Sequence, residues 1–186
     1  MSTSDLYRQQ RKQYSNIRCE SLTCDGSLAG KRSYAVIQYN EAVNTDSINI
    51  TTAPNFVTVP LNEIISDPDS IINSLAVNRF SLEVGTYKLT CNHNLYNSAV
   101  TRNLTRTILR NVTSGEIILS SVNNSVRQGD EIASCLFTGT FDVTDVLDLY
   151  EIQTYFSVNT NTGFGLKLNV GGDKELYLNL FLEKII

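Results

Sequence analysis

The sequence predicts an all-β protein that folds as a single antiparallel sandwich. From Tyr34 onward, short segments of alternating apolar and polar residues are separated by clusters of Gly, Asn, Asp, Ser and Thr. Alternation with a period of two is typical of strands that bury one face. Many short strands between turn clusters are typical of sandwiches. With 186 residues and 41 % hydrophobic content, the chain is long enough for one domain with its own core.

The alternating segments give the order of the expected elements. Turn clusters such as Thr113-Ser114-Gly115 separate them. One helical turn is expected after Asp67, which can cap it, because Pro68 suits a first helical position. The apolar side of that turn would be Ile71, Ile72 and Leu75. Strands are expected at 34–39, 46–51, 56–59, 79–84, 86–92, 104–111, 116–121, 132–141, 149–158, 163–170 and 175–185.

The segment around Gly85 predicts a corner between two strands. Apolar residues alternate before and after this glycine, and a glycine can adopt a positive φ or a bulge where a chain changes direction. The alternating positions are Phe80, Leu82, Val84, Tyr87, Leu89 and Cys91.

The C-terminal segment 176–186 is apolar on both faces of the strand it predicts. One face would carry Leu176, Leu178, Leu180 and Leu182, and the other Tyr177, Phe181 and Ile185. A strand that is apolar on both faces has to bury both, because monomers rarely leave a contiguous apolar patch in water. The N-terminal segment or a loop could cover the second face, or another subunit could. We expect a subunit interface formed by Tyr177, Phe181 and Ile185.

Five motifs, taken in their order, resemble the jelly-roll domain of the tumour necrosis factor (TNF) and complement globular-head superfamily. More closely, they are similar to the versions in virion and tail-fibre proteins of phages and large algal viruses. The resemblance covers residues 33–186 and implies a TNF-like jelly roll, with the C-terminal strand at the axis of an oligomer. The motifs are Ser33-Tyr34-Ala35-Val36-Ile37, Pro60 to Ile65 followed by Asp67-Pro68-Asp69, Asn78 to Leu89, Leu109 to Gly115 and Gly163-Phe164-Gly165.

Charge divides the chain into a basic N-terminal arm, residues 1–32, and an acidic jelly-roll domain, residues 33–186. The arm holds six basic and three acidic residues, and the remainder holds nine basic and sixteen acidic residues. The arm lacks apolar periodicity, so it is expected to be extended. Its contacts are expected to be with other capsid proteins rather than nucleic acid, because a few charges make a weak nucleic-acid footprint. The expected contact residues are Arg8, Arg11, Lys12 and Arg18.

The resemblance and the arm together predict a structural virion protein. The expected role is a capsid or vertex (penton-type) subunit that assembles as a symmetric homo-oligomer, because the sequence has an arm and lacks a collagenous stalk. Trimer and pentamer both remain open, since a jelly roll supports either symmetry. The alternative is a receptor- or glycan-binding head of a viral tail fibre or spike, with a host glycan or receptor as partner. The sequence names neither the virus nor a ligand.

The sequence predicts neither an enzyme nor a metal or cofactor site. The single histidine, His93, lies in a polar segment and is expected to be structural rather than catalytic. Cys19 and Cys24 could pair or bind a metal, but no second ligand pair exists, so zinc is not expected. The spacing of Asp142, Asp145 and Asp148 lacks a calcium-loop pattern.

No signal peptide or membrane insertion is expected either. The first 25 residues contain no apolar h-region, and no window approaches the roughly 20 apolar residues of a membrane span. Synthesis in a host cytoplasm and incorporation into the virion are therefore expected.

Three arginines predict a row of positive charge on one strand. Arg102, Arg106 and Arg110 have even numbers within a strand-like run, whereas Leu109 has an odd one. If Leu109 points inward, as the resemblance implies, the arginines point outward at intervals of about 13 Å. Such a row could bind acidic partners, glycan sulfates or carboxylates on an adjacent subunit, or it could be a solvated charged surface.

Overall fold

A computed structural model describes residues 32–99, 101–127, 131–167 and 174–185. These residues form strands and turns without a helix, which confirms the all-β prediction. The strands are β1 (Ser33–Glu41), β2 (Asn55–Thr58), β3 (Glu63–Ser66), β4 (Ile72–Ala76), β5 (Arg79–Leu82), β6 (Gly85–Asn97), β7 (Asn103–Asn111), β8 (Ile117–Ser120), β9 (Asn124–Val126), β10 (Glu131–Val143), β11 (Tyr150–Phe156) and β12 (Glu175–Lys184).

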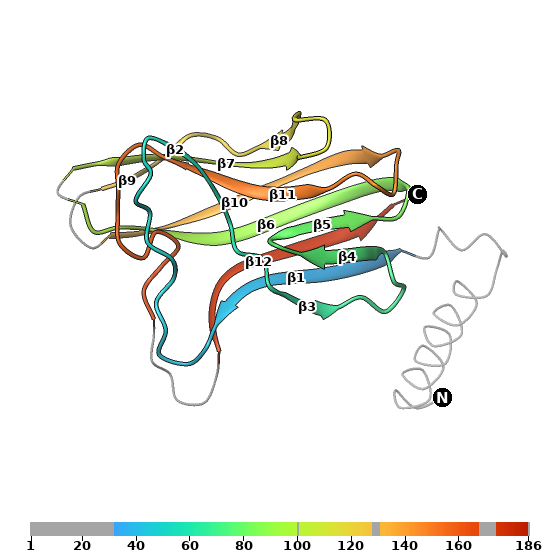
Figure 1. Cartoon of the computed structure of the whole chain (residues 1–186), viewed down its shortest axis with the longest axis horizontal. Coiled ribbons are helices and arrows are strands. Elements are labelled where there is room, and N and C mark those ends of the chain that lie inside the picture. Colours follow the sequence, from blue (N-terminus) through green and yellow to red (C-terminus); the bar gives the residue numbers. More distant parts are fainter. Residues whose placement is uncertain (1–31, 100, 128–130, 168–173, 186) are drawn as a thin grey trace, which may run out of the picture. The chain divides into compact units, whose positions relative to one another are not determined.

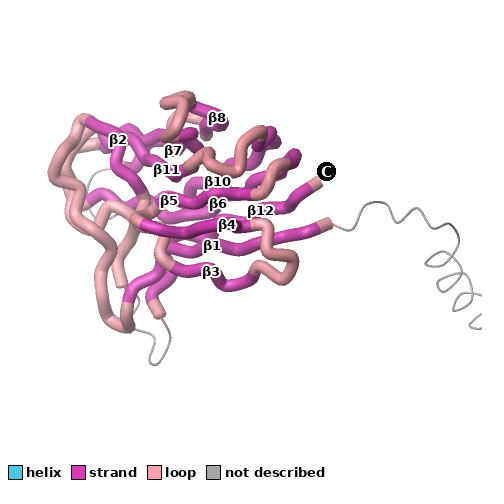
Figure 2. The backbone as a smooth tube through the Cα atoms, turned by 45° about the vertical axis from the view of Figure 1, so that its right-hand side comes forward, coloured by secondary structure: helices cyan, strands magenta, loops and turns pink. Residues whose placement is uncertain are grey.

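The strands form two antiparallel sheets that enclose one core (Figure 1). The five-stranded sheet has the order β10-β6-β12-β1-β3. The seven-stranded sheet has the order β4-β5-β11-β7-β8, with β2 paired to β11 and β9 paired to β7. The chain passes repeatedly from one sheet to the other, as between β5 and β6, through the loops seen in Figure 2. This arrangement is a jelly-roll sandwich, as predicted.

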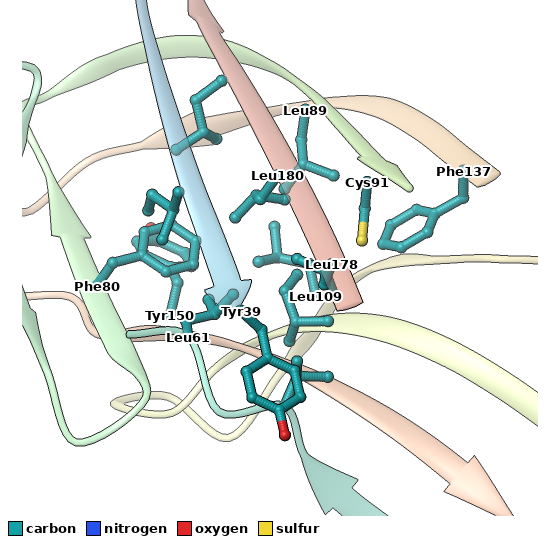
Figure 3. Packing of buried hydrophobic residues seen from close by; sticks show 14 of the residues in the cluster. Tyr39, Leu61, Phe80, Leu89, Cys91, Leu109, Phe137, Tyr150, Leu178 and Leu180 are labelled. Carbon is teal, nitrogen blue, oxygen red and sulfur yellow. The ribbon is translucent and has the colours of Figure 1, made fainter. Parts of the chain in front are cut away.

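Apolar side chains from both sheets meet in the core, as Figure 3 shows for Leu89 and Leu180 of one sheet and Leu109 of the other. Aromatic rings make part of this contact. Phe141 of β10 lies 5.5 Å, centroid to centroid, from Tyr150 of β11. The rings therefore join the sheets directly.

The corner at Gly85 is confirmed. β5 ends in the seven-stranded sheet at Leu82, and β6 begins in the five-stranded sheet at Gly85, whose φ is 156°. A residue without a side chain tolerates this backbone conformation at little cost.

A tight turn after β7 depends on Asn111. The Asn111 Oδ1 accepts hydrogen bonds from the backbone N–H groups of Thr113 and Ser114, at 2.9 and 3.1 Å. Gly115 closes the turn with a φ of 79° and donates its N–H to the Asn111 carbonyl. This geometry explains why asparagine and glycine occupy these places in the motif Leu109 to Gly115.

The predicted helical turn after Asp67 is wrong. The Asp67 carboxylate does cap the segment, accepting hydrogen bonds from the N–H groups of Ile71 and Ile72. However, the chain then enters β4 instead of a helix, and a two-residue turn at Val77 and Asn78 leads into β5. Both turn residues have positive φ, which is the geometry of a tight β-hairpin. Pairing with β5 therefore overrides the local helical pattern.

The segments expected as strands at 46–51 and 163–170 also differ over the residues that the structure describes, which exclude 168–170. The first contributes an isolated bridge between Ile50 and Thr160, and residues 161–164 form a turn. Phe164 is fully buried, its ring lying 5.6 Å from that of Phe156. A Cβ on Gly163 would lie 2.3 Å from Ile50 Cγ1, so this turn needs glycine beside the core.

Candidate interaction surfaces

A β-bulge decides which way the first residues of β12 point. Tyr39 of β1 pairs with Leu178, but the next residue, Asn40, pairs with Leu176. Tyr177 is therefore an extra residue in β12, and the alternation reverses there. As a result Leu176 is exposed and Tyr177 is buried, whereas uninterrupted alternation predicts the opposite. The expectation that Tyr177 shares the outer face with Phe181 is wrong.

The chain itself encloses the Tyr177 ring. The ring centroid lies 5.3 Å from that of Tyr39, and the hydroxyl donates a hydrogen bond to the Thr45 carbonyl. A Cβ on Gly165 would lie 3.3 Å from the ring. Burial raises the pKa of Tyr177 above its usual value. A loop thus covers this part of β12.

Phe181 lies at the centre of an apolar patch on the outer face of the five-stranded sheet. Its cross-strand neighbours are Val36 in β1 and Thr90 in β6. The Tyr34 ring stacks on it, with centroids 6.1 Å apart and an interplanar angle of 20°. Phe181 nevertheless remains 37 % exposed and Tyr34 remains 43 % exposed. We name Tyr34, Val36 and Phe181 the Phe181 patch.

Ile185 lies just beyond the end of β12, on the Phe181 side of the strand by alternation. Its N–H donates to the Thr86 carbonyl, which holds this end of the chain against β6. The side chain is 38 % exposed. Of the three predicted interface residues, Phe181 and Ile185 therefore remain on the surface.

Uncharged polar pairs and charged residues surround the Phe181 patch, and Glu183 pairs in register with Tyr34 and with exposed Lys88. The polar pairs are Gln38 with Asn179 and Thr90 with Thr138. Glu183 also forms an ion pair with Arg32. An apolar centre with a polar, solvent-accessible rim is the arrangement found in protein interfaces.

The arginine row lies on the outer face of the other sheet. Leu109 is buried on the core side, Arg106 is exposed and Arg110 is half-buried. Arg102 is exposed but precedes β7, which begins at Asn103. Ile108 shares the outward face yet is 1 % exposed. The outward direction of Arg106 and Arg110 is therefore as expected, and a role in binding stays a prediction.

A buried carboxylate, which the sequence did not single out, lies beside this row. Glu151 is paired in register with Arg110 and is 4 % exposed. Its two oxygens accept hydrogen bonds from Arg79 Nε at 3.2 Å and from Gln153 Nε2 at 2.6 Å. The Arg110 end of the row thus has an acidic neighbour from its own chain.

The Arg106 end borders a pocket of about 410 Å³. Phe56 of β2, Tyr155 of β11 and Arg106 of β7 are paired in register, so they form one row across three strands. The full lining is Phe56, Leu104, Thr105, Arg106, Asn123 and Tyr155. We name this pocket the Arg106 pocket. Sequence reasoning missed its aromatic residues, although an aromatic side chain at Tyr155, on the polar face of a predicted strand, was a usable signal.

His93 lies in the core and not at a strand end, because β6 continues to Asn97. Its Nε2 is hydrogen-bonded to Thr107 Oγ1 at 2.8 Å, and Thr107 Oγ1 is in turn 3.0 Å from Thr154 Oγ1. The Nδ1 atom has no hydrogen-bond partner of good geometry among the described residues. Burial lowers the pKa of His93 to about 4, so the ring is neutral at pH 7 and fits a structural role.

Two of the four cysteines lie among the residues that the structure describes. Cys91 and Cys135 are buried free thiols. No group of three or more His, Cys, Asp or Glu side chains suited to a metal is found among the described residues. No described helix has the length and apolar content needed to cross a membrane. Cys19, Cys24 and the arm residues Arg8, Arg11, Lys12 and Arg18 lie outside the described residues, so the arm boundary stays a prediction.

Comparison with known proteins identifies the fold. Murine APRIL has a TM-score of 0.53 at 13 % identity, over 83 % of this chain and 99 % of that chain. Eiger TNF from S. frugiperda has a TM-score of 0.52 at 10 % identity, over 83 % and 93 %. The fold is a TNF-like jelly roll. This confirms the resemblance drawn from the five motifs.

The TNF-like jelly roll also occurs in the vertex protein P5 of PRD1, with a TM-score of 0.50 at 12 % identity over 83 % of this chain and 97 % of that chain. No family model matches the sequence, and no curated protein matches it. At these identities the likeness concerns the fold. Within this TNF-like jelly roll, the Phe181 patch lies on one sheet and the Arg106 pocket on the other.

Proposed function

We propose that the protein is a structural virion protein, a capsid or vertex (penton-type) subunit that assembles as a symmetric homo-oligomer. The observation that carries the proposal is the Phe181 patch, an exposed pair of stacked aromatic rings on the outer face of the five-stranded sheet. The fold shared with PRD1 vertex protein P5 supports the viral setting, as does the resemblance to virion proteins.

A second copy of the chain is the proposed occupant of the patch. Covering the remaining exposed area of Phe181, Tyr34 and Ile185 contributes about 1–2 kcal/mol for each side chain. Association costs at least about 4 kcal/mol, so the patch needs the surrounding polar pairs to contribute as well. In a closed ring every subunit makes the same contact with its neighbours. The contacts of the ring therefore act together, and a modest patch on each subunit can hold the oligomer.

Sedimentation velocity at micromolar concentration tests the self-association. The wild-type chain is expected to sediment as a trimer or pentamer, and Phe181→Asp as a folded monomer, because the new carboxylate would be desolvated in the interface. Ile117→Asp is the matched control, since Ile117 is an exposed apolar strand residue on the other sheet. A monomeric wild-type chain overturns the proposed oligomer.

The arm is proposed to contact other proteins of the particle through Arg8, Arg11, Lys12 and Arg18. Deleting residues 2–28 is expected to leave the jelly roll folded and oligomeric but absent from particles. The readout is an immunoblot of purified particles beside circular dichroism and sedimentation of the free chain. Normal incorporation of the truncated chain would show that the arm is dispensable.

The Arg106 pocket favours a second candidate function, a receptor- or glycan-binding head. Its cation and aromatic rings lie away from the Phe181 patch, on the other sheet. Attachment assays separate the two candidates. Pocket substitutions that abolish host attachment, with particle assembly intact, would favour the head over the shell.

A further inference from the structure

We propose that the Arg106 pocket binds a carboxylated sugar, such as a uronic or sialic acid. The proposal deepens the second candidate function and does not depend on self-association through the Phe181 patch. A pocket of about 410 Å³ falls within the roughly 300–1,000 Å³ common for small-molecule sites.

The row Phe56, Tyr155 and Arg106 supplies the recognition groups from a rigid support. The three residues are direct cross-strand neighbours in β2, β11 and β7, and paired strands lie about 4.8 Å apart. The Phe56 and Tyr155 rings have centroids 5.5 Å apart and planes inclined by 61°. Two aromatic rings and one guanidinium are therefore presented side by side on the sheet surface.

One hydrogen bond positions Arg106, and its guanidinium has no ion-pair partner among the described residues. Its Nε donates to Ser120 Oγ at 2.6 Å. None of the ion pairs between described residues uses Arg106. With Nε held, the terminal nitrogens can donate to an external acceptor, and a guanidinium matches the two oxygens of a carboxylate.

The rest of the lining favours a sugar ring as the carrier of the carboxylate. Tyr155 and Phe56 are half-buried and offer apolar ring surface, against which the C–H groups of a pyranose can pack. Asn123 is exposed at the pocket and carries an amide that both donates to and accepts from hydroxyl groups. No acidic side chain lines the pocket, so no carboxylate in the lining opposes a negative ligand.

Ligand-observed NMR titration of the full chain tests the proposal with methyl β-D-glucuronide and N-acetylneuraminic acid as probes. Methyl β-D-glucoside has the glucuronide's ring without the carboxylate and is the matched control ligand. We expect millimolar binding of at least one acidic sugar and at least about tenfold weaker binding of the glucoside. Absence of binding by both acidic sugars at about 20 mM overturns the proposal.

Variants locate the site. Arg106→Gln and Tyr155→Ala are each expected to weaken acidic-sugar binding by about tenfold or more. Arg110→Gln is expected to leave it unchanged, since Arg110 lies on the same strand and face but outside the pocket lining. Thermal melts check that each variant is folded, and an intact fold with unchanged binding in Arg106→Gln contradicts the proposal.

Two further measurements distinguish a sugar site from a surface that attracts any anion. Equal loss of binding in Arg110→Gln, or equal competition by inorganic sulfate, indicates general attraction of anions and overturns the sugar assignment. Phe181→Asp is expected to bind the sugar like the wild-type chain. The two proposals can therefore fail separately: loss of self-association does not affect the test of sugar binding, and absence of sugar binding does not affect the test of self-association.

Discussion

His93 Nε2 and Thr107 Oγ1 lie 2.8 Å apart, and this hydrogen bond connects the two sheets inside the core. His93 belongs to β6 in the five-stranded sheet, and Thr107 belongs to β7 in the seven-stranded sheet. The surrounding burial favours the neutral imidazole and lowers the pKa of His93 to about 4 from 6.5. The burial of His93 therefore links the stability of the sandwich to pH.

The free energy of unfolding is expected to fall as pH decreases from about 6.5 towards about 4. In this window the unfolded chain binds a proton at His93 and the folded chain does not, so acid favours unfolding. The loss from this group amounts to about 3 kcal/mol by pH 4. Urea unfolding curves at pH 7, 6, 5 and 4 measure it.

His93→Gln is the control for this pH dependence. Carboxylates also titrate in acid, so the slope with pH is compared between the two proteins rather than the absolute stability. The variant is expected to lose the part of the slope that lies between pH 6.5 and 5, where carboxylates contribute less. Identical slopes in the two proteins would show that His93 titrates normally.

Gly163→Ala is expected to destabilise the protein by about 1–3 kcal/mol through overpacking. The new Cβ would lie 2.3 Å from Cγ1 of buried Ile50. Gly139→Ala is the comparison, because its Cβ would meet the terminal methyl groups of Leu119, which can rotate away. Chemical denaturation measures both variants, and a smaller effect at Gly163 than at Gly139 would contradict the packing described for this turn.

Asn111→Ala is expected to cost about 1–3 kcal/mol, because the N–H groups of Thr113 and Ser114 lose their acceptor. Asn111→Asp retains an acceptor oxygen and should recover most of the loss. Thermal denaturation of the three proteins at pH 7 measures the difference. Equal stability of the alanine and aspartate variants would mean that the side-chain oxygen is unimportant to the turn.

Cys91 and Cys135 are expected to resist alkylation in the native state. Both side chains are buried, and burial raises the pKa of each thiol, so the reactive thiolate is scarce and inaccessible. Iodoacetamide treatment at pH 8 followed by peptide mass spectrometry should leave both unmodified, whereas guanidinium chloride should expose both. Fast native labelling of Cys91 would reveal opening of the sheet at β6.

Regular alternation predicted the strands that bury one face. The segments 86–92 and 104–111 correspond to β6 and β7, where core-facing residues such as Leu89 and Leu109 alternate with outward ones. The short strands β3 and β4 were missed because each pairs on one side only and has little periodic burial. β3 forms by pairing with β1, which lies earlier in the chain, and β4 forms by pairing with β5, which follows it. The residues of β3 and β4 alone therefore do not reveal these strands.

The surfaces were predicted less completely than the fold. Tyr177 fits the same alternation as Phe181, and only pairing with β1 reveals the bulge that buries it. The Arg106 pocket combines residues from β2, β7 and β11, and the sequence does not place those strands side by side. The sequence thus identifies the outward-facing residues of each strand. To know which of them lie side by side on neighbouring strands, the order of the strands in the sheet is needed.

The location of the Phe181 patch and the Arg106 pocket on different sheets has a consequence for valency. A ring of subunits joined through one sheet would carry as many sugar pockets as it has subunits. Linked sites of this kind raise apparent affinity by about 10²–10⁴-fold without any new contact. A sugar held at millimolar strength by one subunit would then anchor the ring firmly to a surface densely coated with that sugar, with avidity set by subunit number and sugar spacing.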